Sequence, residues 1–408
     1  MINRFVFSVR SLFVVSAVLL PVSYSLAALD KFEPYAFAGV LLDSNIFRLS
    51  GDEEARARFG STNKNDTVGH LGAGFKSDLK LSRQHLLLNA EVDRAMYDTY
   101  DDLDHTRVNG NAVWAWQVGN LWSGNLGYRY LRDMRSFDER TILDPDPLEK
   151  DMRTRQIGFL DAGYQLHPDW ELVGGLEYSD VSYQDRKILD RNATAGKFEV
   201  QYRNTLNSRV GVRVKYTDND LKEREVGGIE ISNDYTETTI SGVFYWEASG
   251  KSALQADLGY TKQSFDEIDG RDYSGSTGRL KYFWEMTGKT NLDFSIWRET
   301  STKNDEVTTY VLTKGVSIVP SWSVTPIIRL RGNIQYENDD FKGQNDIVTA
   351  LGGQRRDDDT WRFGIGADWN PRHYLKLSLS YNYVDRDSSI DANDYDYNQV
   401  GAKVRVEF

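Results

Sequence analysis

The sequence of 408 residues contains no cysteine and only 8 prolines. Without thiols the chain can form neither a disulfide scaffold nor a zinc site built on thiolates. Beyond its N-terminus it also lacks any run of about 18 uncharged apolar residues, which a membrane-spanning helix needs. Basic residues number 49 against 61 acidic ones, and the net charge of −12 argues against general nucleic-acid binding. The aromatic content of 12% is too high for a disordered chain.

Residues 1–27 have the features of a secretory signal peptide. Two arginines precede an apolar run at 12–20, and the small-residue pattern Ser-Leu-Ala follows at 25–27. We therefore expect cleavage after residue 27 and export from the cytoplasm. The alternative is a short membrane anchor, which the brief apolar run and the small residues disfavour. On this interpretation residues 28–408 form a single domain.

The exported part of the chain alternates between apolar and polar residues. The face of the last predicted strand is formed by Val400, Ala402, Val404, Val406 and Phe408. A period of two is that of a β-strand with one apolar face. The same period recurs at 210–216, 254–260, 361–369 and 375–383. These stretches approach the length of about ten residues that a tilted membrane-spanning strand needs. One residue, Lys314, breaks the alternation, and we expect a bulge to absorb it.

Short and long breaks between the strands also alternate. Short turns are predicted at 82–85, 119–121, 167–169, 204–208, 248–251, 287–290, 320–323 and 370–373. Longer breaks are predicted at 44–66, 98–104, 135–152, 183–190, 219–233, 264–271, 301–305, 339–357 and 387–394. Eight short and nine long breaks make seventeen connections, and therefore eighteen strands.

An even number of strands, with both termini on the side of the short turns, is the pattern of bacterial outer-membrane barrels. Seven tryptophans lie in or near the short turns, as expected of an interfacial girdle. We therefore predict an all-β fold, a transmembrane antiparallel β-barrel in the outer membrane of a Gram-negative bacterium. The alternative is a soluble β-sandwich, whose strands are usually shorter and whose connections have no reason to alternate.

A barrel of this size leaves an aqueous channel, and its inward face is predicted to be polar and charged. The predicted lumen-lining residues are Arg209, Arg213, Lys215, Arg279, Lys281, Arg329, Arg331, Arg362, Lys376, Lys403, Arg405 and Trp297. Six of the bases, from Arg329 to Arg405, fall on the last four strands and could form a basic stripe that interacts with an anionic or polar solute. The alternative is that the lumenal charges pair across strands and hold the wall rigid. Trp297 suits a sugar ring, or it serves simply as packing.

No catalytic constellation is evident. The sequence contains neither a G-x-S-x-G nor an H-E-x-x-H motif, and its abundant carboxylates are scattered by the alternation. The acidic stretch 385–391 has an isoleucine where an EF-hand loop needs glycine. We therefore expect no enzyme activity, no cofactor and no metal site.

Two places carry a resemblance to a known family. The closing strand 400–408 resembles the assembly signal of bacterial outer-membrane proteins. Near the start, the strand 35–40 is followed by Asp43-Ser44-Asn45-Ile46-Phe47-Arg48-Leu49. This arrangement is similar to the EpsL-type outer-membrane barrels of exosortase (PEP-CTERM) exopolysaccharide operons, which are related to the β-barrel porin 2 group. The residues of the motif that we single out are Asp43, Asn45, Phe47 and Arg48. Their expected role is to stabilise the turn after the first strand.

The resemblance implies a conduit that secretes an exopolysaccharide across the outer membrane. The implied partners are the polysaccharide substrate, a periplasmic polysaccharide export protein, the barrel-assembly machinery, and outer-membrane lipid and lipopolysaccharide. Two alternatives stay open. One is a general or sugar-selective porin for uptake, and the other is a non-conducting structural barrel.

Overall fold

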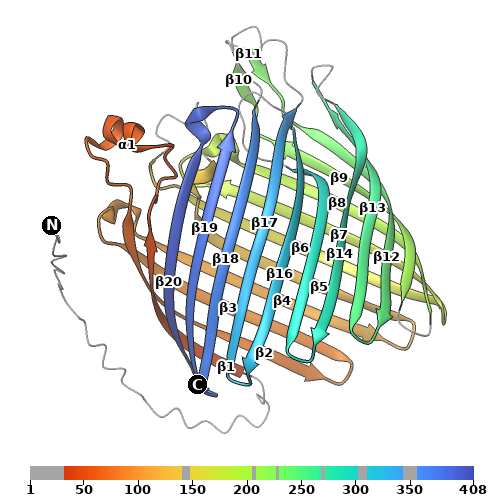
Figure 1. Ribbon diagram of the computed structural model, residues 1–408. Coiled ribbons are helices and arrows are strands. Elements are labelled where there is room, and N and C mark those ends of the chain that lie inside the picture. The colour runs from red at the N-terminus through yellow and green to blue at the C-terminus, as the bar shows by residue number, and fades with distance from the viewer. Residues whose placement is uncertain are drawn as a thin grey trace. The chain divides into compact units, whose positions relative to one another are not determined.

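The computed structural model describes residues 32–139, 148–204, 208–226, 229–267, 272–301, 310–342 and 356–408. Within these ranges, eighteen strands form one antiparallel sheet, and the sheet closes because β20 pairs with β1 (Figure 1). The predicted barrel and its strand count are confirmed. The predicted signal peptide, residues 1–27, lies outside the described residues. No helix in the described ranges combines the length and the apolar character that a membrane crossing would need.

The strands of the first half of the barrel wall are β1 (Phe32–Asp43), β2 (Asp66–Leu81), β3 (Gln84–Tyr97), β4 (His105–Val118), β5 (Trp122–Met134), β6 (Met152–His167), β7 (Trp170–Tyr183), β8 (Arg191–Arg203) and β9 (Arg209–Leu221). The second half consists of β12 (Tyr235–Ser249), β13 (Ser252–Phe265), β14 (Tyr273–Thr287), β15 (Thr290–Ser301), β16 (Tyr310–Thr325), β17 (Ile328–Lys342), β18 (Asp357–Arg372), β19 (Leu375–Ser388) and β20 (Tyr395–Glu407). A separate hairpin, β10 (Arg224–Val226) with β11 (Ile229–Ile231), lies in the break between β9 and β12.

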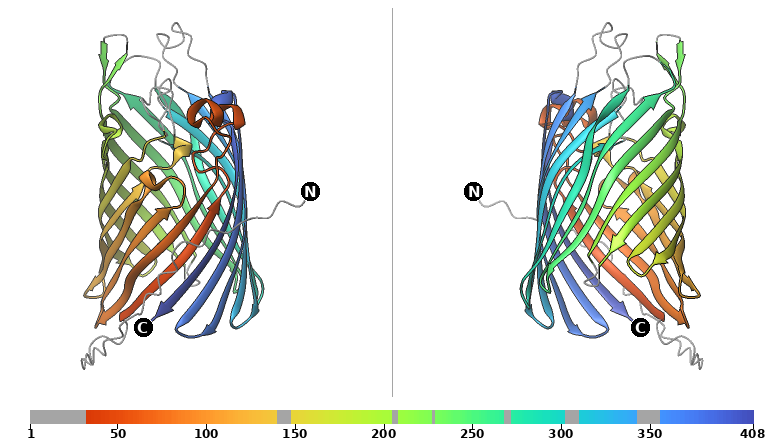
Figure 2. Two further views of the ribbon diagram at one scale, coloured as in Figure 1. Left: turned by 90° about the vertical axis from the view of Figure 1, so that its left-hand side faces the viewer. Right: turned by 90° about the vertical axis from the view of Figure 1, so that its right-hand side faces the viewer.

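The alternation of the sequence sorts side chains between the two surfaces of the wall. Val212 is 58% exposed and Ile365 is 60% exposed, as expected for side chains that face lipid. Charged residues between such positions face the lumen; Arg213, for example, lies between Val212 and Val214 and contacts Glu199 of β8. The short turns and the C-terminus gather at one rim, and the helix α1 (Asp52–Phe59) lies at the opposite rim (Figure 2).

Six of the eight predicted short turns are confirmed, and most of the turn predicted at 204–208 lies outside the described residues. The turn predicted at 320–323 is wrong. There β16 continues to Thr325, and the chain reverses at 326–327. Pro320 sits inside the strand because the ladder to β17 is interrupted at that point, so its missing N–H costs no hydrogen bond there. Gly332 of β17 leaves room for the proline ring, since a Cβ at that position would lie 2.8 Å from Pro320 Cγ.

The predicted bulge at Lys314 is also wrong. The register between β15 and β16 runs from Thr290↔Trp322 to Ser301↔Val311 without a shift, and Arg298 pairs with Lys314. Lys314 therefore keeps its place in the alternation and lies on the exposed face of the wall, next to Val316 on the same face. The register shifts recorded between barrel strands all lie beside short turns.

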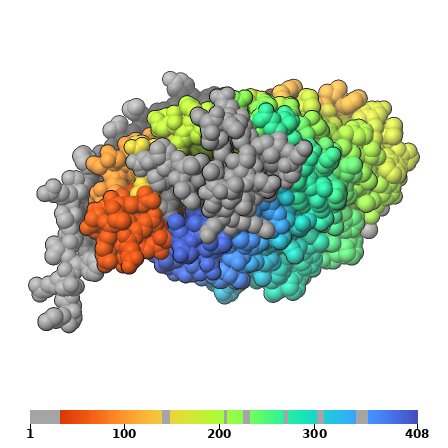
Figure 3. All heavy atoms as spheres, turned by 90° about the horizontal axis from the view of Figure 1, so that it is seen from above, coloured from red at the N-terminus to blue at the C-terminus, as the bar shows by residue number. Residues whose placement is uncertain are grey.

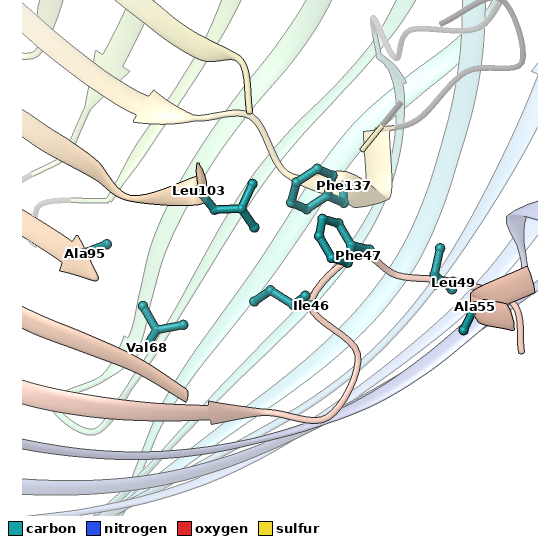
Figure 4. Close-up of a cluster of buried hydrophobic side chains, with 8 residues drawn as sticks. All are labelled: Ile46, Phe47, Leu49, Ala55, Val68, Ala95, Leu103 and Phe137. Carbon is teal, nitrogen blue, oxygen red and sulfur yellow. The ribbon is translucent and has the colours of Figure 1, made fainter. Parts of the chain in front are cut away.

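The segment between β1 and β2 folds over one side of the long-loop rim. Seen from above, α1 lies beside the C-terminal strands (Figure 3). Its apolar core unites Ile46, Phe47 and Leu49 with Leu103 and Phe137, which follow β3 and β5 (Figure 4). This cluster is the main apolar core among the described residues, because most apolar side chains of the strands face outward.

Candidate functional site: the lumen and its mouth

The motif that follows β1 closes on itself. Arg48 donates from Nη1 and Nη2 to the two carboxylate oxygens of Asp43, each at 2.8 Å. Asn45 accepts from the backbone N–H of Leu49 at 2.9 Å and donates to the carbonyl oxygen of Leu49 at 2.8 Å. These contacts hold Arg48 at a φ of +56°, in the left-handed region that a residue with a Cβ adopts only when its surroundings compensate.

The same motif attaches the beginning of the chain to its end. Gln399 donates to Asp43 Oδ2 at 2.8 Å, and Asn45 Nδ2 donates to the carbonyl oxygen of Asp396 at 3.0 Å. The guanidinium of Arg48 lies 3.6 Å from the ring centroid of Tyr397. Burial alone would lower the pKa of Arg48, but the hydrogen bond and charge of Asp43 raise it. We call the set Asp43, Asn45, Arg48, Tyr397 and Gln399 the closure clamp.

Phe47 anchors the segment after β1 against the neighbouring loops. Its ring centroid lies 4.7 Å from that of Tyr100, 4.9 Å from that of Phe137 and 5.1 Å from that of Phe59. Such edge and tilted contacts between aromatic rings stabilise beyond the area that they bury. The expected turn-stabilising role of the motif is therefore only part of its structure, since the motif also builds an apolar core in the barrel mouth.

A set of buried charges continues along the mouth. Arg356 Nη2 donates to Asp358 Oδ2 at 2.6 Å, and Arg386 Nη1 donates to the carbonyl oxygen of Asp138 at 3.0 Å. Burial alone would raise the pKa of Asp138, but the charge of Arg386, a hydrogen bond from Ser136 and further guanidinium groups outweigh it and lower the pKa. The mouth loops are thus fixed by charge pairs as well as by the apolar cluster.

Within the described ranges, six of the eleven predicted lumen-lining bases pair with a carboxylate, and five of these six bases do so with a carboxylate on a neighbouring strand. Arg213 pairs with Glu199 at 2.9 Å and also with Asp257, and Arg279 pairs with Glu299 at 2.6 Å. Arg209 instead lies over the ring of Tyr245, at 5.2 Å.

The six bases of the predicted stripe divide into two groups. Arg331 and Lys376 share Asp368, at 3.0 and 3.7 Å. Arg362 lies 3.6 Å from Glu337, and Arg405 lies 2.9 Å from Glu407. No ion pair is recorded within the described ranges for Arg329 or Lys403. Four of the six bases therefore have a carboxylate partner, with three carboxylates for four cations, and the basic stripe stays a prediction.

The inner wall also contains stacked side chains that the alternation of apolar and polar residues does not predict. Four inward aromatic rings lie against a glycine of the neighbouring strand, and each ring is covered by a lumenal cation. The four sets are Tyr35 with Gly74 and Arg405, Phe37 with Gly72 and Lys403, Phe159 with Gly127 and Arg129, and Trp297 with Gly315 and Arg279. We call these the cation–aromatic–glycine stacks. They leave Trp297 only 7% exposed, so packing describes its observed environment better than an open sugar platform does.

One part of the lumen is hollowed between β9 and β15. This lumenal pocket has a volume of about 360 Å³. Its lining contains four bases, three carboxylates and several hydroxyl side chains; the charged residues are Arg213, Lys215, Arg279, Lys281, Glu237, Asp257 and Glu299. Thr239, Thr261 and Thr277 form a ladder across three strands, with oxygens 2.8 and 2.7 Å apart. Within the described ranges, Lys215 and Lys281 have no recorded ion pair. The carboxylates Asp257 and Glu299 pair with Arg213 and Arg279, and the two ammonium groups beside the row of hydroxyls suit a polar solute that carries negative charge.

No group of three or more potential metal-ligating side chains is found in the residues that the structure describes.

The C-terminal part of the chain, residues 247–408, matches the family model described as "Putative beta-barrel porin 2". The chain forms a porin-like barrel of the outer-membrane type. The match begins at the end of β12 and covers less than half of the porin-like chain. Among curated proteins no match was found.

Solved structures similar to this porin-like barrel include OpdK of Pseudomonas aeruginosa with vanillate, at 10% identity and a TM-score of 0.49, covering 93% of this chain and 100% of that one. OccK2 (OpdF) of Pseudomonas aeruginosa in complex with glucuronate has 10% identity, a TM-score of 0.48, and coverage of 93% and 98%. A BenF-like porin of Pseudomonas fluorescens Pf-5 has 10% identity, a TM-score of 0.46, and coverage of 93% and 100%. A likeness at this level of identity says nothing about the substrate of this chain.

Proposed function

We propose that this barrel is an outer-membrane conduit for the secretion of an exopolysaccharide, as the EpsL-type resemblance of the motif Asp43–Arg48 implies. The observation that supports the proposal best is the local pairing of lumenal charges. A hydrated sugar polymer that slides through a pore must not meet a deep binding minimum. Ion pairs such as Arg213–Glu199 and Arg279–Glu299 keep the wall polar while cancelling much of its charge. The proposed role needs no catalytic step and no cofactor.

The proposed transport works by weak, repeated contacts. Hydroxyl groups of the threonine ladder can exchange hydrogen bonds with sugar hydroxyls at a small net free energy, since each bond replaces one with water. Partners of the conduit would be an inner-membrane polymerase system and a periplasmic polysaccharide export protein, which the same resemblance implies.

The test is an in-frame deletion of the gene, with polymer measured separately in the medium and in the periplasm. We expect secreted polymer to fall and periplasmic polymer to rise, and the intact gene to restore both. Unchanged secretion would contradict the export role. A matched complementation with the variant Arg58→Met, which removes only an exposed ion pair on α1, serves as a control for general effects of expressing a barrel.

A second candidate is an uptake porin for a small anionic solute, and it is favoured by one observation. Lys215 and Lys281 face the lumenal pocket without a recorded ion pair among the described residues. Planar-bilayer recordings of the purified barrel separate this candidate from the first. Anion preference that disappears in Lys215→Gln/Lys281→Gln, together with unchanged polymer secretion in the deletion strain, would establish uptake. A barrel that conducts no ions would instead favour the structural alternative.

A further inference from the structure

The wall of the barrel is incomplete between β14 and β15 near the long-loop rim. Pairing of β14 with β13 continues to Tyr273, whereas pairing with β15 begins only at Gly278↔Arg298. Beyond that point β15 pairs with β16 alone, up to Ser301↔Val311. Among the described residues, 273–277 of β14 therefore pair with a neighbouring strand on one side only. We call this interruption the β14–β15 gap.

A hollow of about 1080 Å³ lies at the β14–β15 gap. Part of its lining faces lipid, since Ile296 is 57% exposed and Val316 is 44% exposed. The lining also includes Trp297, whose side chain belongs to an inward stack, and Thr277 and Gly278. Thr277 and Gly278 line the lumenal pocket as well, so the outer hollow and the lumenal pocket lie on either side of these two residues.

Two cations stand at the outer edge of the gap. Arg298 and Lys314 lie directly opposite each other on adjacent strands, an arrangement that destabilises a sheet when the charges are alike. Arg298 reaches across the gap and donates to Ser276 Oγ at 2.8 Å and to the carbonyl oxygen of Ser276. Lys314 is exposed, and no partner is recorded for it within the described ranges.

The remaining charged group in the hollow is Asp359, and it is already engaged. Tyr336 donates to Asp359 Oδ1 at 2.6 Å, and Asn338 donates to the same oxygen at 3.1 Å. No ion pair joins this carboxylate to Arg298 or Lys314 within the described ranges, and Asn338 lies between Lys314 and Asp359 in the register of the three strands. A group with two or more anionic oxygens, such as a phosphate, would bridge Arg298 and Lys314 and convert their repulsion into attraction.

We propose that the β14–β15 gap is a lateral site for an anionic lipid of the outer leaflet. The phosphate headgroup lies on Arg298 and Lys314, and an acyl chain lies along Leu280, Ile296 and Val316. The inner end of the site opens to the lumen at Thr277 and Gly278. The inference is independent of the solute that is proposed for the lumen.

The experiment places a photoreactive benzoylphenylalanine at Thr277 of the full-length barrel. The protein is reconstituted in phosphatidylcholine vesicles with or without phosphatidylglycerol, and lipid adducts are measured by mass spectrometry. The matched control is the same substitution at Thr239, which belongs to the same hydroxyl ladder but lies on β12, a strand paired on both sides. We expect adducts of phosphatidylglycerol at position 277 and none at position 239.

Removal of the cations tests the headgroup assignment in the same assay. Lys314→Gln and Arg298→Gln should each reduce the phosphatidylglycerol adduct about fivefold, as expected for one cation near an anionic membrane surface. Adducts with phosphatidylcholine should not change. Equal adducts at positions 277 and 239 would overturn the lateral opening. If the adduct yield at position 277 depended neither on the charge of the lipid headgroup nor on the two substitutions, the assignment of an anionic lipid would be overturned.

Added inorganic phosphate distinguishes a lipid site from a simple phosphate site. If the site holds a lipid through both its headgroup and its acyl chain, free phosphate at millimolar concentration should leave the adduct yield unchanged. Full competition by free phosphate would contradict the proposed occupant.

Discussion

Two junctions in this barrel wall are built in opposite ways. At the junction between β1 and β20, the strands are paired from Tyr35↔Glu407 to Asp43↔Gln399, and the closure clamp then continues the contact beyond the ladder. At the junction between β14 and β15, the ladder stops at Gly278↔Arg298, and beyond it only side chains make contact, with Arg298 bonded to Ser276 and Glu299 bonded to Arg279 in the described part of the chain. The first junction joins the two ends of the folded chain, and the second joins neighbours in sequence.

The difference follows from the cost of closing loops. β14 and β15 are connected by a two-residue turn at 288–289, so their pairing is local and part of it can be given up. β1 and β20 are separated by almost the whole chain, and their pairing must offset a large loss of chain entropy. The side-chain contacts of the clamp add free energy at the place where the sequence separation is greatest.

The largest expected effect comes from breaking the clamp. Arg48→Met would leave the buried carboxylate of Asp43 without its charge partner, and such a loss costs about 3–5 kcal/mol. Urea unfolding of the barrel in detergent micelles measures the change. Arg58→Met is the control, because Arg58 forms an exposed pair with Glu54 on α1 and should change stability by less than about 1 kcal/mol. Equal effects of the two substitutions would mean that the clamp does not stabilise the junction.

The next effect comes from the stacks beside the clamp. In Gly72→Ala the new methyl group would overlap the ring of Phe37 and lie 2.5 Å from the carbonyl oxygen of Val92, so the ring must move away from the wall. We expect a loss of about 1–3 kcal/mol in the same unfolding assay. Gly110→Ala is the matched control, since a Cβ there meets nothing within 4 Å. A loss as large at position 110 would attribute the effect to strand propensity rather than to the stack.

Hydrogen exchange compares the two junctions without any substitution. Amides of residues 273–277 that point away from β13 should exchange at least about tenfold faster than amides of residues 35–43, because they lack a ladder partner. Mass spectrometry of the barrel in micelles provides the measurement. Equal protection of the two segments would show that β14 and β15 pair fully in solution.

The smallest effect is one of pH on the barrel mouth. The pKa of Asp138 is lower in the folded protein than its ordinary value, so its contribution to stability is complete above about pH 4. That contribution is lost as the pH falls through the lower folded value. Limited proteolysis of the segment 44–59 with pepsin should therefore accelerate below about pH 4 in the native chain. In Asp138→Asn the acceleration should be weaker, and an identical pH profile would exclude Asp138 as its source.

The sequence was sufficient to predict the barrel and its number of strands, but not the places where individual residues depart from the regular strand pattern. Alternation and turn spacing predicted eighteen strands because every strand must present one face to lipid, which is a local property. Pro320 misled the prediction because proline in a strand interior is tolerated only where a neighbouring ladder is interrupted and Gly332 makes room, and both conditions lie on other strands. The role of Asp43 and Arg48 in closing the barrel could not be predicted either, because their partners Gln399 and Tyr397 lie at the other end of the chain. Lys314 was detected as an irregularity, but only the register with Arg298 gives it a physical meaning.

The pairing of the two ends also bears on how such a barrel can change in size. Every junction other than the one between β1 and β20 lies between strands that follow each other in the barrel wall. A deletion or duplication in the gene that removes or adds one whole hairpin would therefore alter the circumference by two strands and leave Asp43, Arg48 and Gln399 facing each other. Pore width and barrel closure are encoded in separate parts of the chain. The pore width can therefore change during evolution while the contacts that close the barrel are retained.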